Sequence, residues 1–206
     1  MSVFLRRPAL VGAVVSSLVV FSLLTPHGVL AQEMATPGPF PQAPDPAAYV
    51  AEPLTVGDVL AVLADAPATP AAAIPDAAGA GGTPADAETA AAVNATLLQV
   101  FACANAGDPL RFASLYTAPF LREYFGGVPQ ADLEAFLGMP PQPLPAAQRR
   151  IIRGLGEVDL LPDGRARVVI ILDELDDPRT AEPDTVILRQ VDGRWLVDEI
   201  YEAAVD

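Results

Sequence analysis

Hydrophobic residues between positions 87 and 137 recur every three or four positions, which is the spacing of helices that bury one face. The first and longest of these helices follows the segment Thr83-Pro84-Ala85-Asp86, in which Thr83 is the expected N-cap. Gly107 suits the left-handed backbone that often follows the last turn of a helix, so we expect the helix to end there. Its apolar stripe consists of Val93, Leu97, Val100, Phe101 and Ala104.

Three shorter helices are expected after Gly107. Asp108-Pro109 has the sequence of a capped helix start, and that helix is predicted to run to about Tyr116. Two further segments, 119–125 and 129–137, carry apolar residues at helical spacing and predict the other two.

Beyond residue 148 the hydrophobic period changes from 3.6 to 2, which is typical of β-strands. Pro162-Asp163-Gly164 marks one turn, and Asp192-Gly193 forms a two-residue hairpin turn. Helices followed by about four antiparallel strands predict an α+β fold, with the helices packed on the sheet. The predicted strands are 151–160, 165–175, 185–191 and 194–201, with a loop over 176–183 between the second and third.

The two-residue turn predicts the register of the last hairpin. Gln190 is expected opposite Trp195, Leu188 opposite Val197, and Val186 opposite Glu199. One face of the hairpin then carries Leu188, Trp195, Val197, Glu199 and Tyr201, and we expect this more apolar face to lie against the helices. The other face brings Arg189 and Asp198 close enough to form an ion pair.

The N-terminal 31 residues have the pattern of an export signal. Arg6 and Arg7 precede an apolar run over 9–24, and small residues surround a cleavage point after Ala31. The run is short for a bilayer-spanning helix, although an uncleaved membrane anchor remains an alternative. The sequence therefore predicts a secreted or periplasmic protein, bound to a membrane only if this segment is retained.

Residues 32–86 differ in composition from the rest of the chain. They hold ten of the 22 prolines together with many alanines, glycines and acidic residues, which predicts a disordered acidic linker. One apolar island inside the linker predicts a short helix over 56–66, capped by Thr55, which is either docked on the domain or only transient. The predicted organisation is a signal peptide over 1–31, a linker over 32–86 and one domain over 87–206.

Composition excludes several kinds of chemistry. The formal net charge of −14 disfavours nucleic-acid binding, because such a chain repels phosphate backbones. The chain has no lysine, and its one histidine, His27, lies within the predicted signal. A mature protein would therefore lack Ser–His and Cys–His nucleophile pairs, Schiff-base lysines and Cys/His zinc sites. Cys103, the single cysteine, lies in the helical stripe and is expected to be a small buried residue.

No cofactor or metal is predicted. The acidic stretch Asp173-Glu174-Leu175-Asp176-Asp177 has oxygen ligands of the kind that Ca²⁺ prefers, but its spacing is not that of a calcium loop. We therefore favour a solvated acidic loop over a calcium site.

Three segments of the chain form a familiar combination: Cys103-Ala104-Asn105-Ala106-Gly107-Asp108 after the long helix, Leu115-Tyr116, and the hairpin Asp192-Gly193-Arg194-Trp195-Leu196-Val197-Asp198. Together they resemble the nuclear transport factor 2-like superfamily. The resemblance covers about residues 87–206. It implies an α+β cone in which a curved antiparallel sheet wraps the long helix, with a pocket between them. The superfamily includes ketosteroid isomerases, whose oxyanion hole contains a tyrosine and an aspartate. Steroid-isomerase chemistry is not expected here, because Val100 occupies the position of the tyrosine and Val186-Ile187-Leu188 occupies the region of the aspartate.

The expected function is an exported, non-catalytic binding module for a small apolar ligand or a protein partner. One alternative is a pocket enzyme of isomerase, dehydratase or cyclase type that uses a carboxylate and a tyrosine. Another is a cell-envelope scaffold that acts through its acidic tail. The candidate pocket residues are Tyr116, Tyr124, Trp195, Glu199 and Tyr201.

A homodimer is also expected. The centre of the second strand, 168–172, is apolar at every position and therefore needs cover on both faces of the sheet. The helices cover one face, and a second copy of the chain is expected to cover the outer one.

Overall fold

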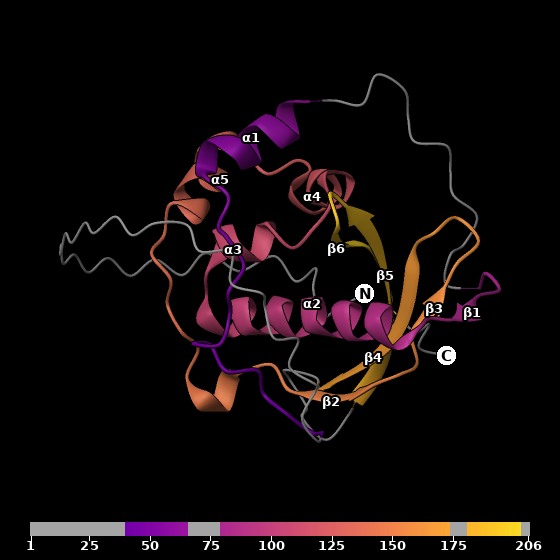
Figure 1. Ribbon diagram of the computed structural model, residues 1–206. Helices are drawn as coiled ribbons and strands as arrows, with labels where there is room; N and C mark the ends of the chain where they lie inside the picture. Colours follow the sequence, from indigo (N-terminus) through magenta and orange to yellow (C-terminus); the bar gives the residue numbers. More distant parts are fainter. Residues whose placement is uncertain (1–39, 66–78, 174–180, 203–206) are drawn as a thin grey trace, which may run out of the picture.

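The computed structural model describes residues 40–65, 79–173 and 181–202. Within these ranges the fold is α+β, with five α-helices and a six-stranded antiparallel sheet of order β1-β3-β4-β5-β6, in which β2 also pairs with β4 (Figure 1). The helices are α1 (Val56–Ala64), α2 (Ala87–Ala106), α3 (Pro109–Ala113), α4 (Ala118–Phe125) and α5 (Gln130–Leu137). The strands are β1 (Thr83–Pro84), β2 (Ile152–Leu155), β3 (Asp159–Leu160), β4 (Ala166–Asp173), β5 (Ala181–Val191) and β6 (Arg194–Glu202).

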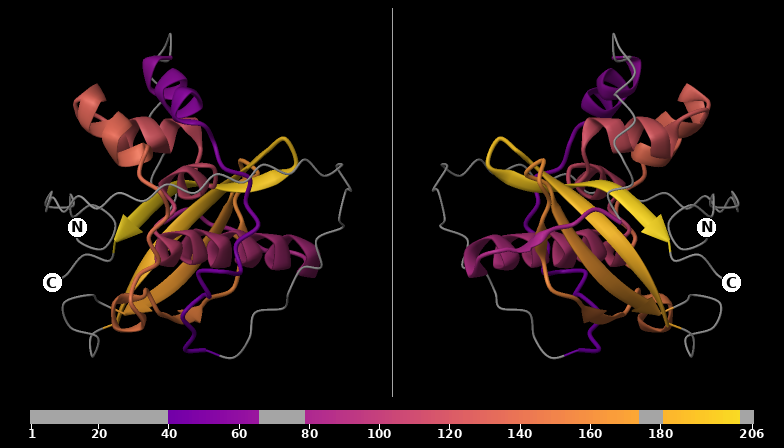
Figure 2. Two further views of the ribbon diagram at one scale, coloured as in Figure 1. Left: turned by 90° about the vertical axis from the view of Figure 1, so that its left-hand side faces the viewer. Right: turned by 90° about the vertical axis from the view of Figure 1, so that its right-hand side faces the viewer.

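The long helix α2 crosses one face of the sheet (Figure 2). The helices α1, α4 and α5 form a second group at one end of the molecule (Figure 2). By length and composition alone α2 is apolar enough to cross a membrane, yet its stripe lies in the core of this fold. The main core fills the space between α2 and the sheet. It includes Val93, Leu97, Val100 and Phe101 from α2 and Ala166, Val168, Ile170, Leu188 and Val197 from the strands.

The N-cap of α2 is Asp86, not the predicted Thr83. The Asp86 carboxylate accepts a hydrogen bond from the backbone amide of Thr89 at 2.7 Å. Thr83 is extended and pairs with Leu160 as part of β1, so its backbone already has sheet partners. The predicted C-terminus is confirmed, since Gly107 has a φ of +61°.

The helix after Asp108 is shorter than predicted. Asp108 is its N-cap, but α3 ends at Ala113, because the following residues run alongside β6. The amide of Val197 donates to the carbonyl of Leu115, and the amide of Thr117 donates to the carbonyl of Val197, both at 2.9 Å. These bonds attach the start of α4 to the sheet.

Much of the predicted linker belongs to the fold, so the expectation of disorder over 32–86 is wrong for residues 40–65 and 79–86. Thr55 caps α1 as predicted, and the helix packs on α4 with Val59 fully buried. The buried amide of Asn105 in α2 donates to the carbonyl of Pro44 at 3.0 Å. Apolar contacts and hydrogen bonds together offset the conformational entropy that this proline-rich segment loses when it becomes ordered.

The sheet has more strands than the four predicted. The segment expected as one strand, 151–160, is divided into β2 and β3, because its pairing with β4 is interrupted around Gly156. Gly156 still donates its amide to the carbonyl of Val169 at 2.8 Å. β5 begins at Ala181, earlier than expected, so the described part of the predicted 176–183 loop is strand.

Candidate functional site

The last hairpin contains a β-bulge that changes the predicted register. Leu188 pairs with Val197 as expected, but Ile187 pairs with Glu199 and Val186 with Ile200. The predicted Val186–Glu199 pair is therefore wrong, because Asp198 is an extra residue in β6. Ile200 joins the main core, whereas Tyr201 packs with Ile187 and Leu161 in a second, smaller cluster. Glu199 and Tyr201 thus belong to the outer face of the sheet, away from α2.

A buried arginine organises this outer face. Arg165 is only 2% exposed, and its Nε donates to Asp163 at 2.7 Å. Its Nη1 contacts both Glu199 and Asp198, the latter at 3.5 Å, and Tyr201 donates its hydroxyl to Glu199. Burial alone would lower the pKa of Arg165, but the contacts with Asp163 and Glu199 raise it above its ordinary value, so the side chain stays a cation.

The extra residue of the bulge, Asp198, has four hydrogen-bond donors around its buried carboxylate. Besides Arg165, Arg189 contacts it through Nε at 3.0 Å and Nη2 at 2.9 Å, which confirms the predicted Arg189–Asp198 pair. Thr117, the N-cap of α4, donates its hydroxyl at 2.8 Å. The bulge therefore links β6 to β5 and to the start of a helix by buried charge-assisted hydrogen bonds.

The two helical candidates lie in an aromatic stack. Tyr116 has its ring centroid 4.6 Å from those of both Phe112 and Phe120, and Tyr124 follows Phe120 at 5.9 Å. Burial raises the pKa of both tyrosines, and that of Tyr116 most strongly, so both are neutral phenols at pH 7. The hydroxyl of Tyr116 is buried and has no hydrogen-bond partner among the described residues.

Replacing Tyr116 with phenylalanine is expected to raise the free energy of unfolding by about 1 kcal/mol. A buried hydroxyl without a partner loses its hydrogen bonds to water on folding and gains nothing in exchange. Urea denaturation of the two proteins measures the difference. Tyr124→Phe is the comparison, because that half-buried side chain is expected to change stability by less than about 0.5 kcal/mol. A clear destabilisation by Tyr116→Phe would show that the Tyr116 hydroxyl makes a stabilising hydrogen bond, which would contradict this prediction.

The five predicted pocket residues do not converge on one site. Tyr116 and Tyr124 lie among the helices, and Glu199 and Tyr201 lie on the outer face of the sheet. Trp195 is half-buried against the core, and its carbonyl accepts a hydrogen bond from Thr96 of α2 at 3.2 Å. A one-residue bulge is enough to separate the tyrosine and carboxylate of β6 from the helices.

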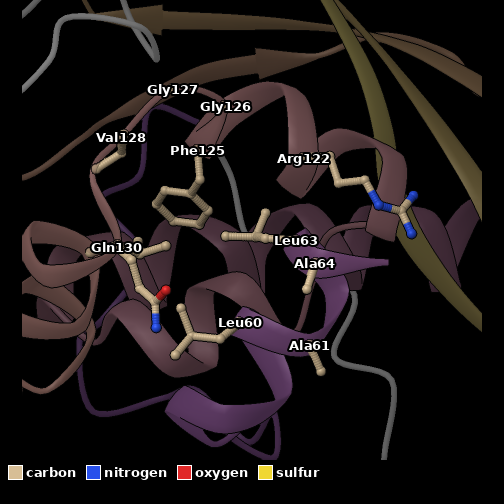
Figure 3. A pocket seen from close by; sticks show the side chains of 11 residues that line it. Leu60, Ala61, Leu63, Ala64, Arg122, Phe125, Gly126, Gly127, Val128 and Gln130 are labelled. Atoms are coloured by element: carbon tan, nitrogen blue, oxygen red, sulfur yellow. The ribbon is translucent and has the colours of Figure 1, made fainter. Parts of the chain in front are cut away.

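Two hollows lie on the helical side of the molecule. We call the larger one, of about 650 Å³, the helical groove. Leu60 and Leu63 of α1 face Phe125 of α4 across it, and the glycines that follow Phe125 form part of its rim (Figure 3). Arg122 lies at one end and Gln130 at the other. Its lining residues are Leu60, Ala61, Leu63, Ala64, Arg122, Phe125, Gly126, Gly127, Val128, Gln130 and Leu133.

The sequence alone did not identify these groove residues. Leu60 and Leu63 belong to the segment whose composition predicts a linker, and Arg122 belongs to no motif. The one available signal was the apolar island around Val59, whose docked alternative proves correct.

The smaller hollow, of about 310 Å³, lies between the end of α2 and the residues after α5. Tyr124 is the predicted site residue that lines it, and Phe125 borders both hollows. Cys103 lies in its wall, is fully buried and has no disulfide partner. Burial raises the pKa of the Cys103 thiol to about 12, with a smaller contribution from Asp108.

Cys103 is therefore expected to be inert in the folded protein. Because its folded pKa is raised, this group contributes stability below its ordinary pKa of about 9, and that contribution is lost as the pH rises toward about 12. Ellman's reagent at pH 8 should label the thiol only after denaturation. The decline in unfolding free energy between pH 9 and 11 should be smaller in Cys103→Ala. Rapid labelling of the native protein would contradict this.

The described residues contain no group of three or more His, Cys, Asp or Glu side chains placed to hold a metal. The acidic stretch that begins at Asp173 lies mostly outside the described ranges. Asp173 itself forms an ion pair with Arg153.

Comparison with known proteins gives no relative: no family model, no curated protein and no solved structure matches this chain.

Proposed function

We propose that this chain is an exported, non-catalytic binding module that holds a small apolar molecule in the helical groove. The observation that carries the proposal is the groove itself. Its volume of about 650 Å³ is within the range typical of small-molecule sites. Three helices supply leucine and phenylalanine side chains to its walls, and Val128 is added by the segment between α4 and α5. The site differs from the expected cone pocket, because it lies between α1, α4 and α5.

The lining of the groove favours binding over catalysis. Within the described part of the chain, its polar side chains are Arg122 and Gln130, and none of the lining residues is a carboxylate, serine, cysteine or histidine. General acid–base and nucleophilic catalysis need such groups within hydrogen-bond reach of the substrate.

The enzyme alternative rests on one specific contact, the hydrogen bond from Tyr201 to Glu199. This pair lines neither of the two hollows, and Arg165 already neutralises the carboxylate. The pair therefore supports a structural role better than a catalytic one. The scaffold alternative has no described contact in its favour.

Export and the nuclear transport factor 2-like family remain parts of the proposal. The first 31 residues lie outside the described ranges, so the signal rests on the Arg6-Arg7 start, the apolar run and the cleavage point after Ala31. The family resemblance is supported by a long helix across one face of an antiparallel sheet and by the confirmed Gly107 cap.

The binding proposal is tested with N-phenyl-1-naphthylamine, a neutral apolar fluorophore, on the full chain. Its fluorescence should rise on binding to the wild type and be lost in Ala64→Phe, which fills the groove from an exposed position. Ala135→Phe is the matched control, because Ala135 is also exposed and helical but lies outside the lining. Equal fluorescence from both variants, or none from the wild type, overturns the proposal.

The homodimer is a separate prediction. Val169 and Ile171 on the outer face of β4 are 39% and 37% exposed, so an apolar strip remains for a second copy to cover. Light scattering at micromolar concentration should give twice the chain mass for the wild type and the chain mass for Ile171→Glu. A wild-type monomer at that concentration would contradict the prediction.

A further inference from the structure

We propose that the occupant of the helical groove is an amphiphile with an alkyl chain and a carboxylate, and that Arg122 binds the carboxylate. This inference rests on the proposed function and adds the chemical class of the ligand. It follows from the position of Arg122, the one cation among the described lining residues, at the end of an apolar groove (Figure 3).

The geometry of Arg122 leaves part of its guanidinium available. Its Nε donates to the carbonyl of Val62 in the last turn of α1 at 2.9 Å, which fixes the plane of the group. Nη2 lies 3.7 Å from Asp65, a residue whose side chain is 85% exposed. Nη1 has no partner within the described ranges. Because exposed ion pairs are weak, a ligand carboxylate can replace Asp65 at little cost.

The charged side chain in the lining of the groove is a cation, which favours an anion over a neutral ligand. Among the described residues of the lining, Arg122 is the one charged side chain, and the side-chain amide of Gln130 at the far end donates to Glu134 at 2.7 Å. A ligand that covers the groove removes water from around the guanidinium. An unpaired buried charge is costly, whereas an arginine fork binds a carboxylate through two parallel hydrogen bonds.

The walls between the two ends fit an alkyl chain. Leu60, Leu63 and Phe125 face one another there, and none of them offers a hydrogen bond (Figure 3). Gly127 adds to the open space, since a Cβ at this position would meet no atom within 4 Å. An extended chain with one polar end matches this arrangement better than a ligand with polar groups along its length.

Calorimetric titration of the full chain with decanoate, dodecanoate and dodecanol tests the inference. Each added methylene should tighten binding about fourfold, so dodecanoate should bind about 15-fold more tightly than decanoate. Dodecanoate should also bind at least tenfold more tightly than dodecanol. All titrations are made below the concentrations at which these amphiphiles form micelles.

Arg122→Met isolates the role of the guanidinium. Binding of dodecanoate should weaken at least tenfold, whereas binding of dodecanol should change less than twofold, which also shows that the groove is intact. Arg149→Met is the control, because Arg149 likewise donates its Nε to a backbone carbonyl, that of Leu144, but lies outside the groove. It should leave both affinities unchanged.

Two failures of this experiment have different meanings. If dodecanol binds at least as tightly as dodecanoate to the wild type, or if Arg122→Met leaves dodecanoate binding unchanged, the carboxylate assignment is overturned and the apolar site stands. If neither compound binds, both this inference and the proposed function are overturned. The first comparison uses the wild type, so it holds even where Arg122→Met fails to fold.

Discussion

Replacing Arg165 with methionine is expected to lower the free energy of unfolding by about 3 kcal/mol. Methionine fills much of the space but leaves Glu199 without the cation that it contacts, next to Asp198, which keeps its ion pair with Arg189. The loss is large because Arg165 is fully buried, so water cannot replace its charge. Urea denaturation monitored by circular dichroism measures the change.

Two further variants separate the charge effect from a packing effect. Adding Glu199→Gln to Arg165→Met removes the carboxylate that has lost its cation, so part of the lost stability should return. Arg149→Met, a half-buried arginine with one backbone hydrogen bond, should cost no more than about 0.5–1 kcal/mol. A cost for Arg165→Met as small as that of Arg149→Met would show that the buried cluster contributes little.

The elements that the sequence predicted well are those with a local physical cause. Thr55, Asp108 and Gly107 cap helices because their own side chains or backbone conformations satisfy the helix ends. The Asp192-Gly193 turn is confirmed for a similar reason, since both residues have the positive φ that a two-residue hairpin requires.

The features that the sequence did not predict depend on contacts between distant segments. The bulge at Asp198 is held by Arg165, Arg189 and Thr117, which lie 33, 9 and 81 positions away in the chain. No local pattern in β6 indicates it, and a one-residue shift moves Glu199 and Tyr201 to the other face. Thr83 is not the N-cap of α2, because its backbone pairs with Leu160 in the sheet.

The candidate site depended most strongly on such distant contacts. The groove is formed where α1 meets α4 and α5, and α1 lies in a proline-rich, alanine-rich region whose composition indicates disorder. Composition describes an average over the segment, whereas docking requires only a few apolar residues, such as Val59 and Leu60, on one face of a short helix. The apolar face of this short helix can be seen in the sequence, but the surface of α4 and α5 on which it packs cannot.

Replacing Gly107 with alanine is expected to lower the free energy of unfolding by about 3–4 kcal/mol. The φ of +61° strains any residue with a Cβ, and a Cβ here would lie 2.3 Å from the carbonyl oxygen of Gln142. The segment after α5 would have to move, which disturbs the 2.7 Å hydrogen bond from the amide of Leu144 to the carbonyl of Asn105. Thermal denaturation of the wild type and the variant measures the loss.

Gly164→Ala is the matched control for Gly107→Ala. Gly164 has a φ of +81°, but a Cβ there would meet no atom within 4 Å, so only the backbone strain of about 1 kcal/mol is expected. The difference between the two variants therefore measures the close approach of Gln142 to the end of α2. The smaller hollow lies beside this contact and is lined by both Gly107 and Gln142, so Gly107→Ala should also change its shape. The helical groove shares only Phe125 with that hollow, so N-phenyl-1-naphthylamine should still bind there, provided that the variant is folded at the temperature of the assay.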